Sequence, residues 1–222
     1  MTIKLFFEAI IKLILGIVIV GLLLFLPGTF EYTQGWLFMG LLFIPMFLAG
    51  IFMMIYNPEL LKRRLDNKEK ESTQKKVVLT SGLMFACGFI IAGLNYRYGW
   101  FILPSIVTYI ASVIFLISYL LYAEVLRENS YLLRTIKVEK NQKVVDTGLY
   151  GVIRHPMYSI TIFLFLSMPL ILGSLISFII FLIYPFIIIQ RIINEEKVLE
   201  KDLKGYKEYE KKVKYRLIPL IW

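Results

Sequence analysis

The stretch VVDTGLYGVIRHPMY, from Val144 to Tyr158, is a short polar island between long apolar segments. It contains Arg154 and His155, the only histidine of the chain. Pro156 keeps His155 out of a regular helix and predicts that a helix begins directly behind it. Polar, irregular backbone at a membrane boundary is tolerated only if it is buried in protein or lines a wet cavity. We therefore expect this stretch to be the centre of a functional site.

The flanking segments have the composition of a membrane protein. Of the 222 residues, 58% are hydrophobic and 18% are charged, and the mean hydropathy is +0.71. An ordinary soluble domain is only about 45–50% apolar. Several apolar runs approach the roughly 20 residues that a helix needs to cross a bilayer. The sequence therefore predicts one all-α, polytopic membrane protein.

Six apolar runs predict six transmembrane helices, of which the last two form a short hairpin. The runs span about residues 8–26, 36–56, 77–96, 100–123, 159–172 and 175–190. A charged segment, residues 197–214, predicts an interfacial or cytosolic helix that is broken near Gly205. The segment between the second and third runs is expected to be polar loop.

Basic residues are distributed asymmetrically over this pattern. Of the 25 lysines and arginines, all except Arg97 fall where the helix count places one side of the membrane. Loops rich in Lys and Arg remain in the cytoplasm, so both termini and the site are expected there. We interpret the net charge of +9 as topology and attraction to anionic lipid head groups. No nucleic-acid-binding motif supports a nucleic-acid partner.

A second polar cluster, RIINEE, continues the last apolar run. Arg191 and Glu195 are four residues apart and share a helical face, whereas Glu196 is rotated by about 100°. Such a pair could bind a zwitterion, or it could be a solvated ion pair worth a few tenths of a kcal/mol. Cys87 is the only cysteine, so the sequence predicts no disulfide and no metal site.

These motifs together carry a resemblance to a known family. The order TGLYGVIRHPMY, an apolar hairpin, RIINEE and GYKEYEKKVKYRLIPLIW resembles the isoprenylcysteine carboxyl methyltransferases, which are integral membrane enzymes. It is also similar to the related phospholipid N-methyltransferases. The resemblance implies a methyltransferase-like region over residues 124–222, behind a transmembrane scaffold of residues 1–123. It implies S-adenosylmethionine as the methyl donor, bound without a Rossmann fold, and the sequence has no G-x-G-x-x-G after a strand.

The resemblance also implies roles for individual residues. The cofactor pocket would be formed by Gln142, Lys143, Val144, Val145, Tyr150, His155, Pro156, Met157 and Tyr158, and by Glu195 from the opposite side. The candidate catalytic residues are Arg191, which would orient and bind the acceptor, Glu195 and Glu196. An amide that usually precedes this region in the family's enzymes of prenylated proteins is absent at the nearby positions, Arg134 and Thr135.

The acceptor is expected to be lipid-like, either a prenylcysteine-type carboxylate or a phospholipid amine. A carboxylate needs no general base, whereas an amine must lose a proton, for which Glu196 or His155 would serve. A membrane reductase of the steroid 5α-reductase type would instead bind NADPH here, but the RxxxEE carboxylates suit a cationic donor and would repel a phosphate. A transporter or scaffold is the remaining alternative, although transporters carry ionisable residues within their helices.

Overall fold

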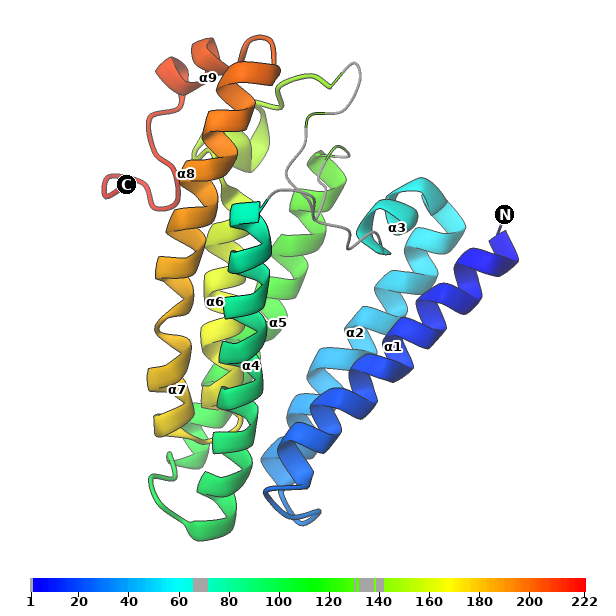
Figure 1. Cartoon of the computed structure of the whole chain (residues 1–222), viewed down its shortest axis with the longest axis vertical. Helices are drawn as coiled ribbons and strands as arrows, with labels where there is room; N and C mark the ends of the chain where they lie inside the picture. Colours follow the sequence, from blue (N-terminus) through cyan, green and yellow to red (C-terminus); the bar gives the residue numbers. More distant parts are fainter. Residues whose placement is uncertain (1, 66–71, 130, 132–137, 139–141) are drawn as a thin grey trace.

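The computed structural model describes residues 2–65, 72–129, 131, 138 and 142–222. Over these residues the chain is built from helices, and its one β feature is an isolated bridge between Ile102 and Ser174 (Figure 1). Five helical segments are long and apolar enough to cross a membrane, and a sixth apolar helix is shorter. The predicted all-α, polytopic membrane class is therefore confirmed.

Two long helices, α1 (Thr2–Phe25) and α2 (Thr33–Tyr56), form an N-terminal pair that leans away from the other helices (Figure 1). A short helix, α3 (Pro58–Leu65), follows directly and corrects the expected polar loop. Asn57 and Pro58 are local signals for the start of this helix. Asn57 Oδ1 accepts a hydrogen bond from Leu60 N at 3.1 Å, and Pro58 occupies the first helical position. Eight residues were too few to show an apolar period.

The remaining helices form the bundle that carries the site. They are α4 (Ser72–Tyr98), α5 (Ser105–Glu128), α6 (Pro156–Ile171), α7 (Leu175–Phe181) and α8 (Tyr184–Asp202). The α5 helix packs along α6, and α4 packs against both α7 and α8. One apolar core joins this bundle to the α1–α2 pair.

The fourth predicted helix begins five residues later than expected. Residues 100–104 are non-helical because Pro104 disfavours helical backbone in the residue before it. Leu103 N instead donates to Gly173 O at 2.9 Å, which ties this loop to the α6–α7 connection. Arg97 and Tyr98, expected in a turn, form the end of α4.

The last hairpin is also longer than predicted. Its first arm, α6, has 16 residues, but α7 and α8 together make a 28-residue candidate span, Leu175–Asp202. The expected break in the charged segment is confirmed, because Gly205 has a φ of +89° and precedes α9 (Tyr206–Lys212). Glycine adopts this left-handed conformation without a steric penalty.

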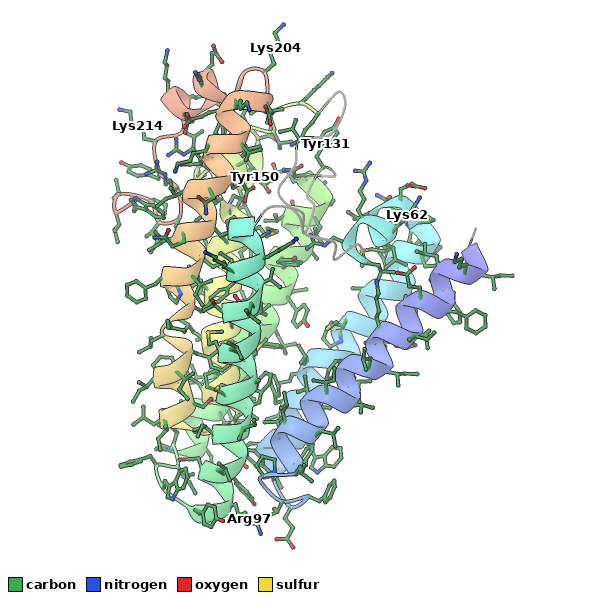
Figure 2. The ribbon with its side chains drawn as sticks, in the orientation of Figure 1. Lys62, Arg97, Tyr131, Tyr150, Lys204 and Lys214 are labelled. Carbon is green, nitrogen blue, oxygen red and sulfur yellow. The ribbon has the colours of Figure 1, made fainter. Side chains whose placement is uncertain are left out.

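The polar segments gather at one end of the molecule. The central stretch, α3, α9 and both chain ends lie there, whereas the α1–α2, α4–α5 and α6–α7 connections lie at the other end (Figure 1). Lys62, Lys204 and Lys214 mark the first end and Arg97 the second (Figure 2). The expected segregation of charge is thus visible for the described residues. Lys68, Lys70, Arg134, Thr135, Lys137 and Lys140 lie outside them.

Packing of α4 on α7 depends on a glycine. A Cβ at Gly88 would lie 2.2 Å from Phe181 Cε2, whereas a Cβ at Gly82 of the same helix would meet nothing within 4 Å. We expect Gly88→Ala to lower the free energy of unfolding by about 1–3 kcal/mol, because the contact becomes overpacked. Gly82→Ala should be neutral or stabilising by up to about 1 kcal/mol. Thermal unfolding in detergent measures both, and equal midpoints would contradict this packing.

Candidate active site

The central stretch folds as a tight turn followed by a helix start. Residues Gly148–Gly151 form a 3-10 turn, η1, and Gly148 has a φ of +48°. His155 is the N-cap of α6 and Pro156 occupies its first turn, as predicted. Pro fits there because the first helical N–H groups have no intrahelical partner. This places Arg154 and His155 in non-helical backbone directly before α6.

The C-terminal segment runs alongside this backbone. Arg154 N donates to Tyr215 O and His155 N donates to Arg216 O, both at 2.9 Å. The Ser159 hydroxyl donates to Leu217 O at 2.6 Å. The tail thus satisfies the backbone donors that Pro156 leaves outside the helix. Sequence reasoning missed this pairing, because a long-range backbone contact has no local signal.

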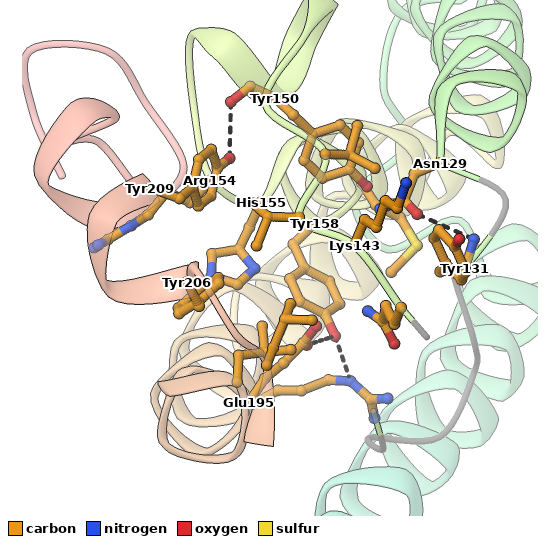
Figure 3. A pocket seen from close by; sticks show the side chains of 17 residues that line it. Asn129, Tyr131, Lys143, Tyr150, Arg154, His155, Tyr158, Glu195, Tyr206 and Tyr209 are labelled. Carbon is orange, nitrogen blue, oxygen red and sulfur yellow. Dashed lines mark hydrogen bonds between the residues drawn. The ribbon is translucent and has the colours of Figure 1, made fainter. Parts of the chain in front are cut away.

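A pocket opens beside the central stretch, at the polar end of the bundle (Figure 3). Ten of the predicted site residues line it, namely Gln142, Lys143, Val144, Val145, Tyr150, His155, Met157, Tyr158, Arg191 and Glu195. They come from the segment before η1, from η1, from the start of α6 and from α8. Pro156 and Glu196 are not among the lining residues.

Seven further residues line the pocket but were not assigned to it from the sequence. They are Asn129, Tyr131, Arg154, Leu199, Leu203, Tyr206 and Tyr209. Helical periodicity could have found Leu199, four residues after Glu195 on α8, and Leu203, four residues further at the C-cap of that helix. Asn129 caps the C-terminus of α5 and brings an amide to the pocket upstream of η1. For this amide, the sequence analysis named only the positions of Arg134 and Thr135, and both lie outside the described residues.

Arg191 and Glu195 meet on the hydroxyl of Tyr158 (Figure 3). The Tyr158 hydroxyl donates to the Glu195 carboxylate, and Arg191 Nε donates to the Tyr158 oxygen at 2.9 Å. The shared helical face predicted for the two α8 residues is therefore present, and α6 supplies the group between them. The arrangement holds a cation and an anion on one phenol hydroxyl.

Glu196 points away from the pocket into a buried ion cluster. Its side chain accepts from Arg216 Nε at 2.7 Å and lies 3.1 Å from Arg154 Nε and 3.2 Å from His155 Nε2. The residue is 3% exposed. A buried carboxylate with such partners is held as a counter-charge. The expected role of Glu196 as a proton acceptor for substrate is corrected, because its oxygens face these three side chains and not the pocket.

Three further tyrosines, Tyr150, Tyr206 and Tyr209, form a tyrosine wall of the pocket. The Tyr209 hydroxyl donates to Tyr150 O at 2.7 Å. Burial raises the pKa of the phenols of Tyr150, Tyr206 and Tyr209 well above the ordinary value, so all three remain neutral hydrogen-bonding groups. Within the described part of the chain, the buried hydroxyl of Tyr206 has no hydrogen-bond partner.

This donor set fits S-adenosylmethionine, which carries cationic, polar and apolar parts. The Glu195 carboxylate suits a cationic group, and the unpartnered Tyr206 hydroxyl offers a hydrogen bond that a ligand can satisfy. Val144, Met157 and Leu199 supply apolar wall. A pocket of mainly apolar surface with a few convergent polar groups is typical of cofactor sites.

The ion cluster around Glu196 should dominate the stability of this end of the molecule. We expect Glu196→Ala to lower the free energy of unfolding by about 3–5 kcal/mol, because it leaves buried cations without their counter-charge. The control is Glu200→Ala, one turn further along α8 and exposed, which should change stability by less than about 0.5 kcal/mol. Thermal unfolding in detergent separates the two, and a Glu196 variant as stable as the control would contradict the cluster's role.

Residues 106–205 match the model of the family described as phospholipid methyltransferase. The match runs from the start of α5 to Gly205 and contains η1, α6 and the Arg191–Glu195 pair. No curated protein matches the chain in a sequence search. The family match confirms the predicted resemblance and supports methyl transfer by an integral membrane protein. Over residues 106–205, somewhat less than half of the chain, the sequence is thus similar to the phospholipid methyltransferases, a family of integral membrane methyltransferases related to the isoprenylcysteine carboxyl methyltransferases.

Proposed function

We propose that the protein transfers a methyl group from S-adenosylmethionine to a lipid-like acceptor that enters from the membrane. One observation carries this proposal: Arg191 and Glu195 meet on the Tyr158 hydroxyl inside a pocket at the polar end of an apolar bundle. Such a charged, partly buried site would be within reach of both solvent and lipid. The family match supports the same class of reaction.

The donor would be held by Glu195 and by the tyrosine wall. The Glu195 carboxylate would bind the cationic amino group of the donor. The Tyr206 hydroxyl, which has no partner among the described residues, would form a hydrogen bond with a polar group of the donor. The backbone of residues 142–145 borders the same pocket. When bound, the donor supplies a methyl group made electrophilic by a sulfonium.

The protein's main contribution would be alignment. Met157 and Tyr158 lie in the first turn of α6, whose start is fixed by Pro156 and by the paired tail. Side chains on such a rigid support keep two reactants in line, and good alignment can supply several kcal/mol of the barrier reduction. Arg191 would orient the acceptor on the α8 side of Tyr158.

Two acceptors fit an arginine at this position. A guanidinium binds either a carboxylate or a phosphate through paired hydrogen bonds. The placement of Glu196 outside the pocket favours a prenylcysteine-type carboxylate, because that acceptor needs no base. The family match favours a phospholipid amine, and His155 would then be the candidate base.

The orientation follows from charge. The end that carries the pocket also carries the Lys-rich α8–α9 segment, whereas Arg97 marks the other end (Figure 2). By the positive-inside rule, the pocket and both chain ends would be cytoplasmic. The same lysines would attract anionic lipid head groups.

Donor binding by purified protein in detergent tests the proposal. S-adenosylmethionine and NADPH are titrated separately into the wild type, Glu195→Gln and the control Glu200→Gln. Glu195→Gln keeps the size of the side chain but removes its charge, so we expect S-adenosylmethionine to bind roughly tenfold more weakly. The control should bind like the wild type. Binding of NADPH alone would move the protein to the reductases, and binding of neither would contradict the proposal.

The same preparations identify the acceptor class. Labelled S-adenosylmethionine is supplied with vesicles that contain either a phospholipid with a primary amine or a prenylated cysteine with a free carboxylate. If label is incorporated with only one of the two vesicle preparations, the lipid in that preparation represents the acceptor class. Mild base hydrolyses a labelled methyl ester and releases the label as volatile methanol, whereas the label on an amine is not released.

A further inference from the structure

We infer that Glu128, the last residue of α5, is a positioning residue that fixes the η1 turn and thereby sets Tyr150 in the donor pocket. The inference rests on the proposed function, since it assigns Tyr150 to donor binding. Glu128 itself does not line the pocket, so it would act through η1 and not by touching a ligand.

The Glu128 carboxylate accepts two hydrogen bonds from the start of the turn. The Thr147 hydroxyl donates to Oε1 at 3.0 Å, and Leu149 N donates to Oε2 at 3.2 Å. The first N–H groups of a helical turn lack partners within it, and a side-chain carboxylate is a strong acceptor for them. Glu128 therefore caps η1 from a different helix.

Gly148 allows the carboxylate to approach this closely. A Cβ at Gly148 would lie 2.1 Å from Glu128 Oε1, and the φ of +48° there also favours glycine. The carboxylate thus sits directly on the glycine that makes the turn. Glycine at position 148 therefore serves two purposes: it permits the positive φ, and its lack of a side chain leaves the space that the Glu128 carboxylate occupies.

The same face of α5 holds the turn through an apolar contact. Val125, three residues before Glu128, is fully buried in a cluster with Tyr150 and Ile160. On the opposite side, Tyr209 binds the Tyr150 carbonyl. Tyr150 is therefore held by an apolar contact and a hydrogen bond, and the register of its turn along α5 is set by Glu128.

The C-terminal end of α5 therefore affects the pocket through two residues. Asn129 lines it directly, and Glu128 contributes indirectly through Tyr150. A shift of η1 along α5 would move Tyr150 relative to Asn129, to Met157 and to the donor. Donor affinity should depend on Glu128 although the residue makes no donor contact.

The test compares S-adenosylmethionine binding by Glu128→Ala, Glu128→Gln and the control Glu124→Ala in purified protein. Glu124 lies one turn earlier on α5 and pairs with Arg127 on the surface. We expect Glu128→Ala to raise the dissociation constant roughly tenfold, as for the loss of a charged acceptor of two hydrogen bonds. Glu128→Gln keeps one acceptor oxygen and should recover most of the affinity. The control should bind like the wild type.

Hydrogen exchange without donor separates positioning from general destabilisation. In Glu128→Ala, the amides of residues 147–151 should exchange faster, while α6 and α8 keep wild-type protection. A variant that binds donor like the wild type, or that loses protection throughout the bundle, would overturn the role of Glu128. If the wild type itself binds no S-adenosylmethionine, the proposed function fails first and this role fails with it.

Discussion

The site depends on the ion pairs that the buried carboxylate of Glu196 makes. This carboxylate joins Arg154 and His155, which precede α6, to α8 and to Arg216 of the tail. Taking these charges out of water is costly unless each has its partner, so the three segments can pack only in one register. In that arrangement the preceding residue, Glu195, faces Tyr158 and the pocket. The two adjacent carboxylates therefore have different surroundings: Glu196 is buried among cations, whereas Glu195 lines the pocket.

The membrane explains why the polar chemistry is concentrated at one end. Helices satisfy their own backbone groups in lipid, whereas irregular backbone must be buried or hydrated. The irregular segments of the central stretch and tail satisfy one another at the polar end, where Arg154 N and His155 N bind tail carbonyls. The shorter α6 begins there, so Met157 and Tyr158 enter the bundle at its boundary. In the proposed function, a site in this position would admit a soluble donor from one side and an acceptor with an apolar tail from the membrane.

Local signals in the sequence were sufficient for the long apolar helices, the turn at Gly205 and the helix start behind His155, but the short α3 was missed. Helical spacing also placed Arg191 and Glu195 on one face. The missed features depend on contacts between distant residues or on short signals. Tyr215–Leu217 pairs with Arg154, His155 and Ser159 over about 60 positions, and Glu196 differs from Glu195 only by what surrounds it in the fold. Pro58 and Pro104 did carry local information on where α3 and α5 begin, but α3 is too short to show an apolar period.

Photolabelling with radioactive S-adenosylmethionine tests the central claim, that the pocket between the central stretch, α8 and α9 is the donor site. Purified protein is irradiated with the donor, digested and mapped by mass spectrometry, with excess unlabelled donor as the competitor. The account predicts competed label on peptides from residues 142–158 or 191–209. Competed label confined to the α1–α2 pair, or label that no competitor removes, would contradict it.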